Sequence, residues 1–374
     1  MLPKPRAGTP LPTSPPGFPT FFSGKRRPRV IASDIWSFLL HYVDVESGLA
    51  QKDKDKALAY TNQAFEFYEA ASSPRFGSRP LLYYYAFLNV TKAFLTARRV
   101  ALPPRARHGI SDPKANVKQR LRLEGQSITV ENAAADHSAI LPEFIASLSP
   151  TRGLGRSYRV LDLLAQVPSI HRAYQTVQSA KSSGRPGKLW NQGPCFAPIR
   201  RFELLSAGSQ IWTVARLDAS SEDASLVAPK LEAMRGFRAT FTRVEPLVAG
   251  EIWYESSPLA RGRRTLDPCI SALAERVSQL GVWAVLTRDG YRPYLGAVPE
   301  SKRVNQLVST YAVMFYLGSI TRYKPYDYDT ILEGRYAWVV DEFLATQPVQ
   351  FLYCLASVLV GAEVVRPFAV TMEP

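Results

Sequence analysis

Apolar residues recur with a helical spacing in the first quarter of the chain. The pattern predicts helices over residues 35–43 and 54–71, and Ser33 or Asp34 can cap the first of them. A third helix is expected to begin at Pro80, because proline suits the first turn of a helix. A group of helices is therefore predicted near the start of the chain.

The apolar spacing then changes from a helical period to a period of two. The segments QIWTVARLD, FRATFTRVEP and GEIWYESS are rich in alternating, β-branched or aromatic residues, which is typical of strands. VWAVLTRDGYRPYLGAV predicts a hairpin that turns at Asp289-Gly290. Helical patterns at 141–148 and 158–167 interrupt these strands. Residues 115–300 are therefore predicted to form a mixed α/β, strand-rich region.

Helical spacing returns in the last seventy residues. A long apolar helix is predicted over residues 304–323, and Pro325 forbids its continuation. Two more helices are predicted over 336–347 and 351–365, separated by Pro348. The chain thus ends, as it begins, with helices.

These patterns predict an α+β fold. Residues 30–114 and 301–374 are expected to pack together as one helical domain, with the strand-rich region 115–300 inserted between them. Residues 1–29 hold seven prolines before Phe21, so we expect an extended arm that binds a protein partner.

The positive charge of the chain is concentrated in two segments. Lys and Arg number 46 against 32 Asp and Glu, a net charge of +14. Residues 1–30 carry +6 and residues 75–122 carry +10, so the remainder is close to neutral. Such segments favour a polyanion partner, most of all nucleic acid, although a solvated Arg-rich surface would look the same. The candidate polyanion-binding residues are Arg98, Arg99, Arg105, Arg107, Arg120 and Arg322.

Scarce cysteine and histidine exclude several classes of protein. The three cysteines are widely spaced and the four histidines show no paired ligand spacing, so neither a disulfide framework nor a zinc site is expected. P-loop, dinucleotide-loop and GxSxG motifs are absent, and we expect no cofactor. Asp327 and Asp329 remain an alternative metal site. The apolar stretch 351–365 is too short to cross a bilayer, so we expect a cytoplasmic protein without membrane contact.

Residues 79–110 and 304–344 carry motifs that are specific in combination. They contain RPLLYYYAFLNVTKAFL, HGI, MFYLGSITRYKP and WVVDEFL. These segments resemble the YaaC-like family of bacterial proteins, whose members share L-x-Y-Y-x-x-L-N-x-x-K-A, a downstream His-Gly, and a late L-G-S-x-x-R-Y-x-P. The resemblance implies a bacterial, cytosolic protein with mainly helical ends, and it implies no particular reaction.

Polar residues interrupt two of the predicted core helices. Asn89 and Lys92 share one helix face, where a buried amide or ammonium is costly unless it is partnered. The late helix repeats the situation with Ser319 and Arg322, followed by Tyr323. Such residues either form a structural polar network or line a cleft.

One hypothesis joins both ends of the chain in an anion site. Lys92 and Arg322 would bind the anion, Asn89, Ser319 and Tyr323 would orient it, and His108 would transfer a proton, with Lys92 as a second catalytic candidate. The alternative is structural: Arg322 pairs with Glu342 or Asp341, Lys92 keeps its ammonium in solvent, and His108 caps a loop.

Three functions follow from these observations. The first is a polyanion binder, most of all of nucleic acid, acting as a subunit of a larger complex. The second is an enzyme on a small phosphorylated or nucleotide-like substrate in the Lys92/His108/Arg322 cleft. The third is an architectural subunit that binds protein through its arm and basic face.

Overall fold

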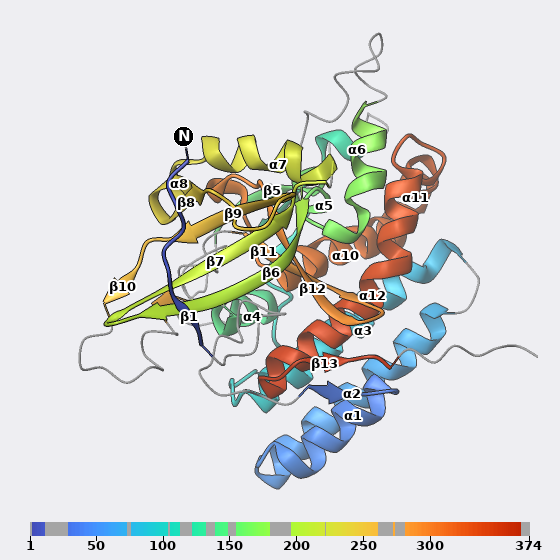
Figure 1. Cartoon of the computed structure of the whole chain (residues 1–374). Helices are drawn as coiled ribbons and strands as arrows, with labels where there is room; N and C mark the ends of the chain where they lie inside the picture. The colour runs from blue at the N-terminus through green and yellow to red at the C-terminus, as the bar shows by residue number, and fades with distance from the viewer. Residues whose placement is uncertain are drawn as a thin grey trace, which may run out of the picture. The chain divides into compact units, whose positions relative to one another are not determined.

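Two compact units make up the chain in the computed structural model (Figure 1). The helical unit comprises Ala32–Ser183 and Val304–Leu359, and the sheet unit comprises Met1–Ile31, Gly184–Arg303 and Val360–Pro374. Within them the structure describes residues 2–11, 29–72, 76–103, 105–112, 122–131, 139–148, 155–179, 196–220, 222–260, 272–273 and 281–367.

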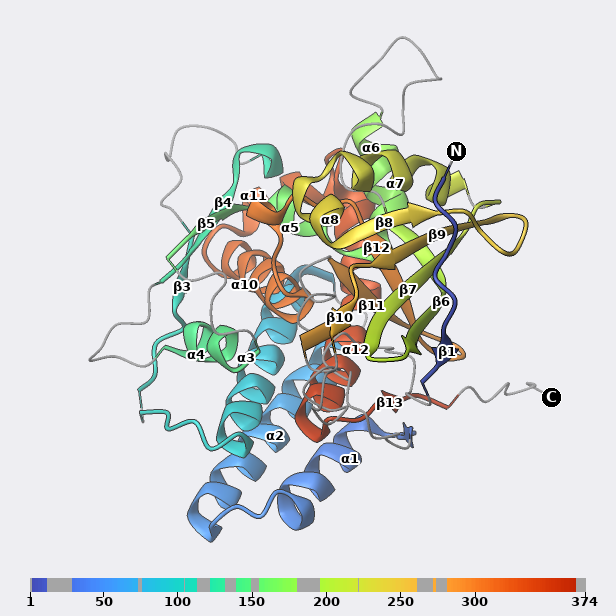
Figure 2. The ribbon, with the colours of Figure 1, turned by 60° about the vertical axis from the view of Figure 1, so that its left-hand side comes forward.

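Helices from both ends of the chain build the helical unit, which confirms the predicted α+β class. Its central helix, α3 (Arg79–Ala97), packs against both α2 (Gln51–Ser72) and α10 (Gln306–Tyr323) (Figure 2). Phe87 of α3 stacks on Phe351 with ring centres 4.0 Å apart. The remaining elements are α1 (Ile35–His41), a π-helical turn (Tyr42–Glu46), α4 (Ile140–Leu148), α5 (Val160–Leu164), α6 (His171–Ser179), α11 (Pro325–Leu332), α12 (Ala337–Val360), and the strands β3 (Ile110–Ser111), β4 (Ser127–Val130) and β5 (Ser157–Arg159).

One prediction in the helical unit is wrong. Pro348 does not separate two helices but lies inside α12. Proline removes one backbone hydrogen bond there, yet residues on both sides of it, such as Phe343 and Phe351, are buried in the core. The burial of both halves outweighs the missing bond. Among the described residues, only α12 is long and apolar enough to cross a membrane, and 67% of that stretch is buried inside the protein, as in a soluble core helix.

An antiparallel sheet forms the sheet unit, with strand order β11-β12-β6-β7-β9-β8. The strands are β6 (Phe196–Ala207), β7 (Gln210–Asp218), β8 (Phe241–Val244), β9 (Glu251–Ser256), β11 (Val282–Thr287) and β12 (Gly290–Gly296). Helices α7 (Glu222–Ala233) and α8 (Arg235–Thr240) bury Val227, Leu231 and Phe237 in one hydrophobic cluster with strand residues such as Ile211 and Tyr254. Short strands β1 (Thr9–Pro10) and β10 (Leu259–Ala260) join β6 and β7. Outside this sheet, β2 (Val30–Ile31) pairs with β13 (Val364–Val365).

Two elements of the sheet unit differ from their predicted positions. Thr287 pairs with Gly290, so the hairpin turn is made by Arg288 and Asp289, and Gly290, at φ +108°, opens the next strand. The segment FRATFTRVEP is half helix, because α8 ends at Thr240 before β8 begins.

The units differ in extent from the domains that the pattern suggested. The prediction places residues 115–300 together, whereas α4 and α5 lie in the helical unit and contact α3 and α10. Residues 2–11, predicted to extend toward a partner, lie against the sheet of their own unit. The rest of the predicted arm, except residue 29, falls outside the described residues.

Candidate functional site

One face of α3 carries the polar residues that the sequence singled out. The hydroxyl of Tyr85 accepts a hydrogen bond from Arg322 Nη1 at 2.7 Å, which ties α3 to α10. One and two turns further along, Asn89 is 4% exposed and Lys92 is half-buried. The Asn89 side chain makes no hydrogen bond to any described residue. An amide on this face could bond to a ligand, because it carries both donors and acceptors.

Backbone hydrogen bonds hold His108 beside this face. The carbonyl oxygens of Arg107 and His108 accept from the amides of Ile140 (2.9 Å) and Leu141 (3.1 Å) at the start of α4. The Gly109 carbonyl accepts from the Glu131 amide at 3.0 Å. These three bonds fix the backbone on both sides of the imidazole.

Gly109 is required for that position. Its φ is +73°, where residues with a side chain are strained, and a Cβ built there would lie 2.3 Å from Pro142 Cδ. The close approach to α4 is possible because glycine has no side chain. Gly109 therefore serves the placement of His108.

The His108 ring bonds to α3, and its surroundings lower its pKa. Its Nδ1 forms a hydrogen bond with the hydroxyl of Tyr84. Burial lowers the pKa of His108, the nearby cations Lys92 and Arg322 lower it further, and Glu131 acts in the opposite direction. Burial also raises the pKa of Tyr84, so that phenol keeps its proton. Lys92 and Arg322 thus both act electrostatically on His108.

Neither cation has a carboxylate partner among the described residues. The Lys92 ammonium lies 5.2 Å from the centre of the Tyr60 ring, and burial lowers the pKa of Lys92. Arg322 contacts the hydroxyl of Tyr85 and the face of Tyr323, whose ring centre is 4.9 Å away. The alternative in which Arg322 pairs with an acid of the last long helix is therefore not observed. We call Lys92, His108 and Arg322 the cationic cluster.

The two other orienting candidates have different surroundings. Ser319 donates a hydrogen bond to Asp112 at 3.0 Å and so holds the segment after His108 against α10. Tyr323 is 68% exposed. Ser319 thus positions the backbone, and Tyr323 offers an aromatic face to solvent.

Two predicted polyanion-binding residues are engaged in backbone contacts. Arg98 donates to the carbonyl of Val358 at 2.8 Å, near the end of α12, and Arg99 donates to that of Gly48 at 3.2 Å. Arg105 and Arg107 are exposed and make no ion pair within the described part of the chain. Arg120 lies outside the described residues.

A separate cavity lies elsewhere in the helical unit. Its volume is about 280 Å³, and Arg122, Arg335 and Tyr336 are among the residues that line it. Lys92, His108 and Arg322 do not line this cavity. Within the described ranges, no group of three His, Cys, Asp or Glu side chains could hold a metal ion. Nothing there brings further ligands to Asp327 and Asp329.

The sequence missed two tyrosines of this site. Tyr84 binds the imidazole and Tyr60 faces the ammonium. Tyr84 sits in a run of three tyrosines whose spacing indicates core, and it is indeed buried. Its hydroxyl function follows from the approach of residue 108, which no local pattern reveals.

The comparison with protein families decides the identity of the chain. The family model for the YaaC-like Protein matches residues 20–359. The chain belongs to the YaaC-like family. The match extends the resemblance seen in residues 79–110 and 304–344 through the middle of this YaaC-like protein. Searches of the curated proteins and of the solved structures gave no match.

Proposed function

We propose that this YaaC-like protein binds a small phosphorylated, nucleotide-like molecule at the cationic cluster. The observation that carries the proposal is the pair of cations, Lys92 and Arg322: both lower the pKa of His108, and neither has a carboxylate partner among the described residues. A phosphate would neutralise these two cations and accept charge-assisted hydrogen bonds from them.

His108 supplies the proton chemistry of the proposed site. In the tautomer that suits this role, the Tyr84 phenol donates to Nδ1 and Nε2 of the imidazole carries the hydrogen. A bound phosphate would accept from Nε2 and would raise the pKa of His108. The imidazole is therefore the group that can give a proton to, or take one from, the ligand near neutral pH.

The surroundings of the cluster favour a ligand with a ring beside its phosphate. Tyr323 exposes most of its ring next to Arg322, and aromatic faces of this kind stack on nucleobases. Asn89 carries an amide, with donors and an acceptor, on the same helix face as Lys92. A nucleotide-like molecule could use all three features, with its phosphate on the cationic cluster, its base on Tyr323 and a polar group on Asn89.

Calorimetric titration with nucleoside mono-, di- and triphosphates and with inorganic phosphate tests the proposal. We expect Lys92→Gln and Arg322→Gln each to weaken nucleotide binding about tenfold, because each removes one charge-assisted contact worth roughly 1.5 kcal/mol. Lys56→Gln is the matched control, since Lys56 is an exposed cation of the same unit that already pairs with Asp53. Unchanged affinity in both cluster variants would contradict the proposal.

The titration of His108 gives a second test. We expect its pKa, measured by NMR of the imidazole protons, to lie below the ordinary value of about 6.5 in the unliganded protein. Lys92→Gln should raise the pKa of His108, because a neighbouring cation is lost. Saturation with nucleotide should raise it as well, so binding should take up protons and tighten as the pH falls toward 6. If the pKa of His108 changes neither in Lys92→Gln nor on saturation with nucleotide, His108 does not belong to the cationic cluster.

Nucleic acid is the second candidate, and one observation favours it. Arg105 and Arg107, in the segment that leads to His108, are exposed cations without described ion-pair partners, so they could contact further phosphates. A single-stranded oligonucleotide in the same titrations separates the two candidates. The affinity for a polynucleotide would fall steeply as the salt concentration rises. Arg105→Gln and Arg107→Gln would each make this dependence on salt less steep, by about the contribution of one phosphate contact. The affinity for a mononucleotide would not change in either of these two variants.

A further inference from the structure

The cavity of about 280 Å³ in the helical unit lies between two stretches of chain that are far apart in the sequence. Arg122 and the short 3₁₀ turn Leu123–Gly125 line it from one stretch, and the junction of α11 and α12, from Thr330 to Tyr336, lines it from the other. Its volume is just below the range of roughly 300–1,000 Å³ that is usual for small-molecule sites. The space therefore suits a ligand smaller than a nucleotide.

The lining of the cavity has an apolar part and a part that is open to solvent. Leu123, Ile331 and Tyr336 are buried, and they supply aliphatic and aromatic surface. Arg122 and Gly334 are exposed, so a ligand can enter from their side. In small-molecule sites, surface of the first kind holds the hydrocarbon part of the ligand, and a few polar groups set its orientation.

Arg335 is held in a fixed orientation at this cavity. Its Nε and Nη2 donate to the carbonyl oxygen of Val177 in the last turn of α6, at 3.0 and 2.6 Å. Its guanidinium lies 5.2 Å from the centre of the Tyr336 ring, and Gln178 of α6 donates to the Tyr336 hydroxyl at 3.1 Å. Nη1 of Arg335 makes no hydrogen bond within the described part of the chain. The guanidinium is thus positioned before any ligand binds, which lowers the entropic cost of binding.

Charges of both signs border the cavity and are not paired with each other. Arg122 and Arg335 form no ion pair with a described residue, and neither does the carboxylate of Glu124. Burial raises the pKa of Tyr336, Glu124 raises it further, and Arg335 lowers it, so both signs of charge act on this phenol. Two cations and one acid therefore line the same space without neutralising one another.

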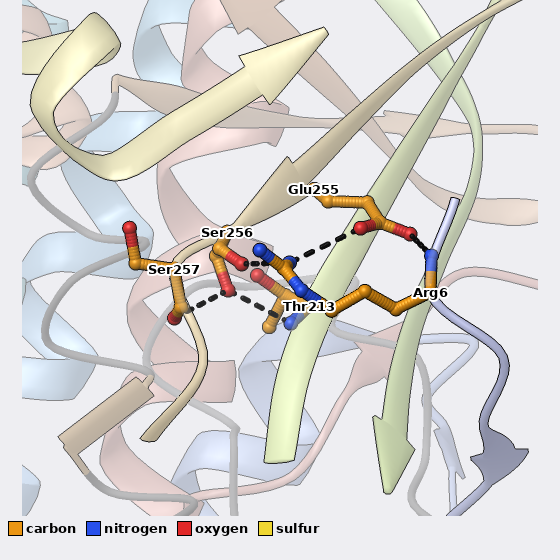
Figure 3. Close-up of polar contacts among 5 residues, drawn as sticks. All are labelled: Arg6, Thr213, Glu255, Ser256 and Ser257. Carbon is orange, nitrogen blue, oxygen red and sulfur yellow. Dashed lines mark hydrogen bonds and ion pairs between the residues drawn. The ribbon is translucent and has the colours of Figure 1, made fainter. Parts of the chain in front are cut away.

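Two acids of the sheet unit show the contrasting arrangement. Glu255 accepts from the backbone amide of Arg6 at 3.0 Å and from Arg6 Nη1 at 3.1 Å (Figure 3). Glu203 pairs with Arg201 at 2.7 Å. Acids that leave the solvent are usually paired in this way. Glu124 is half-buried and has no such partner among the residues that the structure describes, so its oxygens are available to a ligand.

We propose that this cavity binds a free α-amino acid with an apolar side chain. The ligand carboxylate binds the guanidinium groups of Arg122 and Arg335, whose planar forks match a carboxylate. The ligand ammonium binds Glu124, and the ligand side chain packs on Leu123 and Ile331. A ligand with a single charge leaves either the arginines or the acid without a partner, whereas a zwitterion pairs with both. This site shares no residue with the cationic cluster, so the proposal does not depend on nucleotide binding there.

Calorimetric titration with L-valine, L-leucine, L-methionine and L-phenylalanine tests the proposal on the full chain. Each amino acid is compared with the matched acid, which lacks the ammonium, and with the matched amine, which lacks the carboxylate. For L-leucine these are isocaproate and isopentylamine. We expect at least one amino acid to bind about tenfold more tightly than either of its analogues, because each analogue loses one charge-assisted contact. No binding of any of the four at millimolar concentration, or equal binding of an analogue, would overturn the proposal.

Variants at two charged positions assign the two ends of the ligand. The side chains of Arg122 and Glu124 bond to no described residue, so Arg122→Gln and Glu124→Gln should keep the melting temperature of the protein. We expect each variant to weaken binding of the amino acid about tenfold. Arg122→Gln should not weaken binding of the amine, and Glu124→Gln should not weaken binding of the acid, because each of these analogues lacks the group that the lost charge contacts.

Matched controls come from the same unit. Arg156 and Glu69 are exposed and do not line the cavity, so Arg156→Gln and Glu69→Gln should leave amino-acid affinity unchanged. Arg122→Gln and Glu124→Gln should also leave nucleotide affinity unchanged, which separates this site from the cationic cluster. Amino-acid affinity that is the same in Arg122→Gln, Glu124→Gln and both controls would overturn the proposal.

Discussion

Alanine in place of Gly109 is expected to destabilise the protein by about 2–4 kcal/mol. Two effects add. A residue with a side chain is strained at φ +73°, and the new Cβ would overlap the ring of Pro142, 2.3 Å away, and Cβ of Ala139, 2.8 Å away. Relief requires the His108 segment to separate from α4, which would also break the hydrogen bonds from Ile140 and Leu141. Nucleotide affinity should therefore fall together with stability.

Urea unfolding of the variant and of Gly208→Ala separates the two effects. Gly208 also has a positive φ, +55°, but a Cβ there would meet nothing within 4 Å. The free energy of unfolding of this control should fall by only about 1 kcal/mol, the cost of placing a residue with a side chain at positive φ. If both variants lose the same free energy of unfolding, the close approach of the His108 segment to α4 is not what makes Gly109 necessary.

Removal of the Arg6 guanidinium is expected to destabilise the protein by about 1–3 kcal/mol at neutral pH. Arg6→Ala leaves the carboxylate of Glu255, which is 2% exposed, without its described ion-pair partner. Glu255→Gln removes the charge, so the double variant should be more stable than Arg6→Ala alone. Lys56→Ala is the control, because its exposed pair with Asp53 should change stability by less than about 0.5 kcal/mol.

The loss in Arg6→Ala should depend on pH with a definite sign. Burial already raises the pKa of Glu255, and removal of Arg6 raises it further. A carboxyl group whose folded pKa lies above its unfolded value of about 4.3 destabilises the protein when it must ionise. The destabilisation should be complete above the folded pKa and should shrink as the pH falls toward 4. Equal losses at pH 4.5 and pH 7.5 would contradict a charged Glu255 as the cause.

The helices near both ends were predictable because their signals are local. The apolar spacing of residues 304–323, an Asn305 side chain that accepts from the Leu307 amide, and Pro325 define α10 without any distant contact. The same holds for β7 and β9, whose β-branched and aromatic residues favour a sheet. The strand β6 was missed, because Pro198 and the charged pair Arg200-Arg201 interrupt its apolar residues, and its register shifts at the same place.

The candidate site was predictable in its members and not in its contacts. Asn89 and Lys92 stood out because they interrupt an apolar helix, and Arg322 because it follows one. The interaction of Lys92 and Arg322 with His108 depends on Gly109, on α4 and on Tyr84, which come together only in three dimensions. The contacts of residues 2–11 were hidden for a similar reason. Their prolines predict extension, but the buried acid that receives Arg6 lies about 250 residues further along the chain.

The division of each unit into separate stretches of chain affects how the protein is made. Helix α3 is complete at residue 97, but its packing partner α10 begins at residue 306. At about 5–20 residues per second, a ribosome needs on the order of 10–40 s to produce the residues between them. During that interval the apolar side of α3, including Phe87, has neither α10 nor Phe351 to cover it. The nascent chain should therefore depend on chaperones that shield helices until translation is nearly finished.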